Sequence, residues 1–320
     1  MTSVYPLNRK ERDLWILARR PERNPLSEHR PVSFFTERER SKSGEIVDVA
    51  TIFLSNRECP WRCVMCDLWQ NTLTETVSPE SIPEQMDFAL GELGPARHLK
   101  LYNSGSFFDV RAIPSASIPA IAERCAGFET VVVESHPLLV GESSLRFRDL
   151  LHGRLEVAMG LETANPKTLE LLNKGMTLEQ FESSAGFLRS NDIDLRVFIL
   201  VKPPFQDESE ALHWARASID LAFDCGASAV SLIPTRAGNG ALEALATTGE
   251  FTPPRLAMLE AAHDYGVASR RGRVFADLWD LEPFSNCATC FPARIERMRE
   301  MNLSQQSHDQ VRCSDCGGGL

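Results

Sequence analysis

The sequence predicts an α/β fold of six βα units arranged as a partial barrel, with an N-terminal extension and a small C-terminal unit. Two observations predict it. Near-continuous apolar, β-branched runs recur from residue 47 onward, and helix-length segments separate them, as in parallel strands buried on both faces. A doubly wound open sheet is the alternative, because periodicity does not fix strand order. Either arrangement puts reactive groups at the carboxyl ends of the strands.

Six apolar runs are expected to form the strands. They span residues 46–55, 98–105, 129–135, 154–162, 194–202 and 228–235. The segments between them carry signals for helix starts, and Thr177, followed by Gln180, has the form of a capping box. Strand and helix therefore alternate through the middle of the chain.

Three regions are expected along the chain: an N-terminal extension over residues 1–46, the barrel over 47–250, and a C-terminal helix and four-cysteine unit over 251–320. A loop at RSKSGE ends the first region. Beyond residue 250 the rhythm changes, and the sequence predicts a helix over 253–269, a strand over 273–279 and a helix over 291–302. The last helix lies between two cysteine pairs, which favours a separate, smaller unit.

Charge is distributed unevenly. The net charge of −10 divides into +3 for residues 1–46, −12 for residues 47–250 and −1 for residues 251–320. An acidic middle region repels phosphate backbones, so the composition argues against a protein that grips long nucleic acid unaided. If RNA is bound, the arginine-rich first region is the expected contact.

Membrane insertion and secretion are not expected. The sequence contains no window of about 18 uninterrupted apolar residues. Its first 15 residues carry charge where a signal peptide needs an apolar stretch. We therefore expect a cytoplasmic protein, in which nine cysteines indicate metal or redox chemistry rather than disulfides.

Three cysteines follow the first predicted strand with C-x3-C-x2-C spacing: Cys59, Cys63 and Cys66. Three thiolates on one loop can converge on a metal centre, and soft ligands select iron–sulfur clusters or zinc. A [4Fe–4S] cluster normally takes four cysteines, so three would leave one iron open to a further ligand. The alternatives are a zinc site or a chance grouping.

The triad, in the first strand-to-helix loop of a βα series, resembles the radical SAM superfamily. The resemblance implies a [4Fe–4S] cluster whose open iron binds S-adenosylmethionine (SAM). One electron then cleaves SAM and releases a 5′-deoxyadenosyl radical. It implies SAM contacts from Met65, where the family usually has an aromatic residue near the adenine, and from Ser104, Gly105 and Ser106, where it has a glycine-rich turn. An ordinary strand-to-helix turn is the alternative for the serines and glycine.

Further candidates stand at other strand ends. Glu134 could bind the amine of SAM or of a substrate, and His136 could transfer a proton or be a structural histidine. Glu162 could accept hydrogen bonds from ribose hydroxyls, or serve as an acidic residue near a helix start. Lys202 could pair with the SAM carboxylate or be solvated. We predict catalytic roles for Glu134 and His136, and cofactor binding for Glu134, Glu162 and Lys202.

The C-terminal region contains two Cys-x2-Cys pairs, Cys287 with Cys290 and Cys313 with Cys316. Four cysteines so spaced fit a structural zinc site, which would supply folding energy to a short tail. A second [4Fe–4S] cluster is the competing occupant, and a reduced, metal-free tail is the third possibility.

Several segments resemble one subgroup of the Elongator-catalytic-subunit-like radical SAM class, the archaeosine synthase β-subunit group. They are LYNSGSFFD, VVVESHP, VAMGLETANPKTLELLNKGMT, VKPPFQDESEA and SLIPT with FTPPRL. The resemblance implies a lyase or transferase acting on a modified nucleobase or nucleoside, with C–N bond cleavage in tRNA modification as the specific expectation. It implies SAM, a flavodoxin or ferredoxin electron donor, and tRNA or a tRNA-modifying protein as partners. The alternatives are an unrelated small-molecule substrate and a non-catalytic zinc-binding scaffold.

Overall fold

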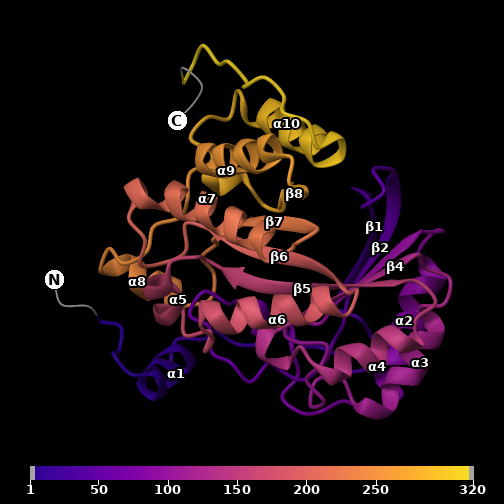
Figure 1. Cartoon of the computed structure of the whole chain (residues 1–320). Coiled ribbons are helices and arrows are strands. Elements are labelled where there is room, and N and C mark those ends of the chain that lie inside the picture. The colour runs from indigo at the N-terminus through magenta and orange to yellow at the C-terminus, as the bar shows by residue number, and fades with distance from the viewer. Residues whose placement is uncertain (1–3, 317–320) are drawn as a thin grey trace.

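A computed structural model describes residues 4–316. In this part of the chain eight strands form one sheet in strictly sequential order, curled into an open half-barrel (Figure 1). The strands are β1 Ser33–Arg40, β2 Ile46–Phe53, β3 His98–Tyr102, β4 Thr130–Ser135, β5 Arg154–Glu162, β6 Asp194–Val201, β7 Ala229–Pro234 and β8 Arg273–Ala276. Strand β1 pairs antiparallel with β2, and all later neighbours are parallel.

Sequential strand order decides between the two predicted topologies. A doubly wound sheet reverses its order at a switch point, whereas this one does not. The partial barrel is therefore confirmed, and the six predicted runs form β2 to β7. A large apolar core fills the space between the sheet and its outer helices, with Val157, Val197 and Val230 fully buried in the middle strands.

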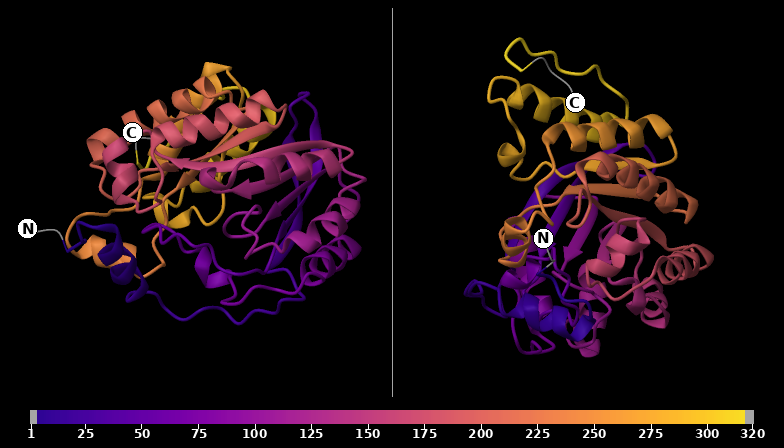
Figure 2. Two further views of the ribbon diagram at one scale, coloured as in Figure 1. Left: turned by 60° about the horizontal axis from the view of Figure 1, so that its bottom comes forward. Right: turned by 90° about the vertical axis from the view of Figure 1, so that its left-hand side faces the viewer.

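The helices lie mainly on the convex side of the sheet (Figures 1 and 2). They are α1 Arg9–Leu17, α2 Ser81–Glu92, α3 Ile118–Arg124, α4 Glu142–Leu150, α5 Pro166–Leu171, α6 Leu178–Ser190, α7 Glu208–Asp224, α8 Ala241–Thr247, α9 Leu256–Ser269 and α10 Phe291–Ser304. The capping box predicted at Thr177 is present, since its side chain accepts from the Gln180 backbone N–H and the Gln180 side chain accepts in return.

The sheet extends across both predicted region boundaries. Strand β1 lies before residue 47 and β8 lies after residue 250, so both flanking regions contribute to the barrel. Helix α10 packs against both of these outermost strands. Its Asn302 and Gln305 side chains hydrogen-bond the backbone of Ala276 and Val274 at the edge of β8. The division into three regions stays a prediction.

A network of buried charges occupies the amino-terminal end of the barrel. Glu39 on β1 accepts from Lys100 and from Arg196, each at 2.5 Å. Arg196 also donates to Glu156 at 2.6 Å, and Arg273 on β8 donates to Glu156 at 2.8 Å. Each charge has an opposite partner, which satisfies the main requirement for burying ions. The opposite, carboxyl-terminal end is left for the predicted site residues.

Among the helices of residues 4–316, none combines the length and the apolar character needed to cross a membrane.

Candidate functional site

The segment Arg57–Cys66, called the cysteine loop below, leaves the carboxyl end of β2. Two later segments hold it by hydrogen bonds. The Val64 N–H donates to the Leu172 carbonyl at 3.0 Å, and the Asn173 side chain donates to the Arg62 carbonyl at 2.8 Å. The Asn239 side chain donates to the Val64 carbonyl at 2.8 Å. The loop is thus fixed by the chain that follows β5 and by the chain that follows β7.

Glu58 fixes the start of the same loop. Its carboxylate pairs with Arg20 at 2.7 Å, with Arg62 at 3.0 Å and with Arg23. The two arginines from the N-terminal region lie over the ring of Trp69, just beyond the loop. Arg20 and Arg23, from the arginine-rich first region, therefore anchor the cysteine loop.

The three thiols of the loop lie in a desolvated environment. Burial raises the pKa of Cys59, Cys63 and Cys66 to about 12 in the absence of a metal. A cation is what would hold such thiols as thiolates. The donor set, three partly buried cysteines on one fixed loop, fits a metal–sulfur centre with an open position.

The Asn103–Ser106 turn lies against this loop. Ser104 has a φ of +53°, and a Cβ atom at Gly105 would come within 3.1 Å of the Cys59 Cβ. Glu134, at the end of β4, accepts hydrogen bonds from the backbone N–H groups of Asn103 at 2.5 Å and Gly105 at 3.3 Å. Burial raises the pKa of Glu134 to about 7 despite these bonds. The predicted Gly105 turn, Glu134 and Cys59 are brought together.

His136 supports the cysteine loop from the side. Its ring stacks on Trp61, with 3.6 Å between ring centroids and 5° between planes. Both ring nitrogens have partners: Nδ1 accepts from the Leu138 N–H, and Nε2 lies 3.1 Å from the Lys174 carbonyl. Burial lowers the pKa of His136 to about 3, so the ring is neutral near pH 7. Proton transfer by His136 stays a prediction.

Glu162 forms a buried ion pair with Lys174, at 2.5 Å between Oε1 and Nζ. Glu162 has a φ of +67° and stands at an irregularity in the β5–β6 register. Gly160 makes room for the pair, because a Cβ atom there would collide with Glu162 Oε1 and lie 2.5 Å from Lys174 Nζ. Lys174 was absent from the sequence-based candidates, although it stands in the LLNKG segment that the resemblance includes.

The four C-terminal cysteines also come together, around the start of α10. Cys287 Sγ lies 3.8 Å from Cys313 Sγ, and Cys290 Sγ lies 3.7 Å from Cys316 Sγ. All four sulfur atoms lie within 4.8 Å of one another. The sequence-predicted four-cysteine metal-binding group is confirmed as a spatial group.

No family model matches the chain. The sequence is 26% identical to archaeosine synthase subunit beta of Methanosarcina acetivorans, over 83% of this chain and 81% of the relative. It is 25% identical to an uncharacterised protein of Methanocaldococcus jannaschii, over 73% of this chain and 68% of the relative.

Among solved structures, Elp3 of Methanocaldococcus infernus matches with a TM-score of 0.52 at 14% identity, over 80% of this chain and 63% of that one. SuiB of Streptococcus suis matches with the same score at 13% identity, over 76% of this chain and 52% of that one. The chain therefore has the fold of these radical SAM proteins, and its sequence is similar to that of archaeosine synthase subunit beta. The resemblance that the sequence motifs indicate is thus matched by a similarity of sequence to archaeosine synthase subunit beta and of fold to Elp3.

Two of the residues predicted to bind the cofactor make other contacts. Met65 packs against an apolar group that includes Tyr5, Ile16 and Leu242. The Lys202 ammonium donates to the Thr252 carbonyl at 2.5 Å and to its hydroxyl. Cofactor binding by these two residues stays a prediction.

The candidate site also contains buried polar groups that the sequence did not predict. The side chain of Asn103 is fully buried, and within residues 4–316 neither its Nδ2 nor its Oδ1 has a hydrogen-bond partner. The hydroxyl of Ser55, just after β2, is likewise buried without a partner in this part of the chain. Unpaired buried polar atoms at strand ends are expected where a polar ligand completes the site.

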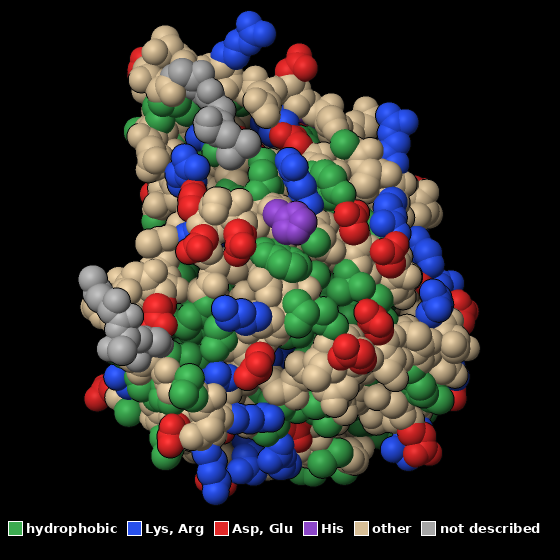
Figure 3. Space-filling view, turned by 60° about the vertical axis from the view of Figure 1, so that its left-hand side comes forward, with side chains coloured by type: hydrophobic (Ala, Val, Ile, Leu, Met, Phe, Trp, Pro, Cys, Tyr) green, Lys and Arg blue, Asp and Glu red, His purple; other side chains and the backbone are tan. Residues whose placement is uncertain are grey.

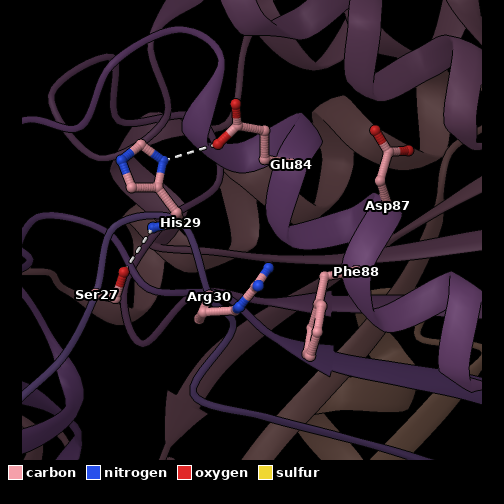
Figure 4. Close-up of a pocket in the computed structure, with 6 residues that line it drawn as sticks. All are labelled: Ser27, His29, Arg30, Glu84, Asp87 and Phe88. Atoms are coloured by element: carbon pink, nitrogen blue, oxygen red, sulfur yellow. Dashed lines mark hydrogen bonds and ion pairs between the residues drawn. The ribbon is translucent and has the colours of Figure 1, made fainter.

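A surface groove of about 600 Å³ lies elsewhere, beside α2 (Figure 4). His29 hydrogen-bonds Glu84 at 2.7 Å, and the Arg30 guanidinium lies over the Phe88 ring. Asp87 pairs with Arg124. These groups satisfy one another, so we assign no function to the groove. On the face in Figure 3, acidic and basic side chains are interspersed, with a group of Lys and Arg side chains at the lower end.

Proposed function

We propose that the chain is a radical SAM enzyme in which Cys59, Cys63 and Cys66 hold a [4Fe–4S] cluster. One observation carries the proposal. Three desolvated thiols lie on one fixed loop, at the carboxyl ends of the strands of a radical SAM fold. Three protein ligands leave one position for SAM. The cluster supplies, when bound, the electron that cleaves SAM reductively.

The chain's own residues would bind and orient SAM. Glu134 would accept from the SAM amine, beside the Gly105 backbone. Glu162, held by Lys174, would accept from ribose hydroxyls. The unpaired amide of Asn103 would gain a polar partner from the ligand. His136 would keep Trp61 and the cysteine loop in place.

We further propose a role in tRNA modification, on a modified nucleobase or nucleoside. Support comes from the relative named archaeosine synthase subunit beta. That name also favours a partner protein as the route to RNA, which agrees with the acidic barrel region. C–N bond cleavage, a flavodoxin or ferredoxin donor and a cytoplasmic location belong to the same proposal. An unrelated small molecule is the alternative substrate.

We propose zinc for the C-terminal cysteine group. Zinc binds thiolates at about 2.3 Å, so a tetrahedral site separates its sulfurs by about 3.8 Å. The sulfur separations of 3.7 and 3.8 Å agree with this value. A [4Fe–4S] cluster binds its cysteines through four different irons and needs them further apart.

Anaerobic reconstitution tests both assignments. The wild-type chain is expected to bind about four irons and one zinc, and to release 5′-deoxyadenosine when reduced with dithionite in the presence of SAM. Cys63→Ser should lose iron and SAM cleavage while keeping zinc, and Cys313→Ser should lose zinc while keeping iron. Cys225→Ser, at the half-buried residue after α7, is the matched control and should keep both.

Other outcomes are decisive. A chain that binds zinc alone and takes up no iron would contradict the enzyme proposal and favour the scaffold. About eight irons and no zinc would contradict the zinc assignment. For the substrate, release of 5′-deoxyadenosine should rise with one of a panel of tRNAs and modified nucleosides; enhancement by an unrelated small molecule alone would contradict the tRNA role.

A further inference from the structure

We propose that the buried ammonium group of Lys174 raises the reduction potential of the metal–sulfur centre held by Cys59, Cys63 and Cys66. The inference rests on the proposed function, because it assumes that a cluster binds to the cysteine loop. In this proposal Lys174 does not touch the substrate. Its fixed charge acts on the cluster from beside the cysteine ligands.

Backbone geometry places Lys174 beside the cysteine loop. The two residues before it, Leu172 and Asn173, hydrogen-bond the residues on either side of Cys63: Leu172 bonds Val64, and Asn173 bonds Arg62. The chain from 172 to 174 therefore runs alongside the middle cysteine. The Lys174 carbonyl in turn lies 3.1 Å from Nε2 of His136, whose ring stacks on the loop.

The Lys174 ammonium is buried and interacts electrostatically with Cys59 and Cys63. It is bonded to Glu162 Oε1 at 2.5 Å, and the residue is 7% exposed. Its charge favours the ionised forms of the Cys59 and Cys63 thiols, whereas the Glu162 carboxylate disfavours ionisation of Cys63. Both members of the ion pair therefore interact electrostatically with cluster ligands, with opposite sign.

Packing alone does not explain this pair. Burying two charges costs solvation energy that an apolar pair of similar volume would not lose. The fold nevertheless keeps a glycine at position 160 so that both groups fit, and holds Glu162 at a positive φ. A costly, space-demanding pair beside metal ligands is typical of a functional arrangement.

The effect on the cluster follows from Coulomb's law. A cluster with three thiolate ligands becomes more negative when one electron is added. A fixed cation in a poorly solvated site stabilises the reduced form more than the oxidised form, which raises the potential. A nearby anion does the reverse. Lys174 and Glu162 should therefore shift the potential in opposite directions.

A redox titration of the iron-loaded chain, followed by electron paramagnetic resonance in the absence of SAM, tests this. Lys174→Met should decrease the equilibrium constant for reduction of the cluster at least tenfold. For one electron, a tenfold decrease is a shift of about 59 mV to more negative potential. Lys174→Arg should stay near wild type, and Glu162→Gln should shift to less negative potential. Lys167→Met, which removes the same charge at an exposed position of α5, is the control and should not shift.

Iron content and far-UV circular dichroism of each variant report folding and loading separately. If Lys174→Met misfolds, the double variant Lys174→Met/Glu162→Gln removes both charges. Its potential should be more negative than that of Glu162→Gln, and at or below the wild-type value because Lys174 has the larger effect on the cysteines. Equal potentials for Lys174→Met, Glu162→Gln and wild type, with full iron, would overturn the inference alone. A wild-type chain that takes up no iron would instead overturn the proposed function.

Discussion

The carboxyl group of Glu134 is desolvated at the end of β4. The stability of the folded chain should therefore depend on pH. Because burial raises its pKa to about 7, the folded chain binds a proton more tightly than the unfolded one. Its contribution to stability is full below pH 4.5 and is lost as pH rises through 7. We predict that Glu134→Gln stabilises the metal-free chain by about 1–2 kcal/mol at pH 8.5, and much less at pH 5, in urea unfolding.

Glu129→Gln provides the comparison, because Glu129 is exposed and pairs with Arg97 at the surface. Its effect should be small and nearly independent of pH. An equal stability change for Glu134→Gln at pH 5 and pH 8.5 would contradict the prediction. It would show that Glu134 does not change its protonation state between these pH values.

Single residues differed in how well the sequence predicted them. The cysteine groups could be predicted from their spacing, because metal ligands on one loop must lie close together in the sequence. Lys202, directly after β6, and Lys174, between α5 and α6, show the opposite case. Lys202 turns to Thr252, whereas Lys174 meets Glu162 in the site. A one-dimensional pattern contains no information on where a long side chain points.

Helix α10 protects the edge of strand β8 with two side-chain amides. Asn302 accepts from the Ala276 N–H at 2.8 Å and donates to its carbonyl at 2.9 Å, as a neighbouring strand would. We predict that Asn302→Ala lowers the free energy of unfolding by about 1–3 kcal/mol, because two buried backbone groups lose partners. Denaturant unfolding measures it. Gln306→Ala, at an exposed neighbour, should change little; equal losses would contradict this role for Asn302.

At the level of elements, the six apolar strands and the late helices were predicted, but β1 was not. Its sequence, SFFTERER, has no strong apolar alternation. Glu39 is buried between Lys100 and Arg196, and the partly exposed Glu37 also pairs with Lys100. A strand stabilised by ion pairs looks like a polar loop, because its partners lie far along the chain.

The whole barrel is tied together by the charge network at its amino-terminal end. Ion pairs with Arg196 and Arg273 lower the pKa of Glu156 to about 2, against the effect of its burial. Its contribution is therefore present above pH 4.5 and is lost as pH falls toward 2. We predict that Glu156→Gln costs about 3–5 kcal/mol at pH 7, since it leaves buried arginines unpaired.

Urea unfolding at pH 7 and at successive values down to pH 3 checks this prediction. The difference between Glu156→Gln and wild type should shrink below pH 4.5, because the unfolded wild-type chain binds a proton there that the folded chain does not. A difference that stays constant over this range would mean that lost shape rather than lost charge destabilises the variant. The sequence could not predict this network, because its members come from five strands spread over more than 230 residues.

The two outermost strands, β1 and β8, do not bond to each other, and α10 packs against both. The tail beyond α10 returns to Cys287 and Cys290, just before the start of that helix. The group of four sulfurs therefore links the two ends of α10. Under the proposed zinc assignment, loss of zinc would therefore do more than loosen a tail. If α10 came away, the backbone edge of β8 would be free to pair with another molecule, so the proposed zinc centre would also protect the protein from polymerisation.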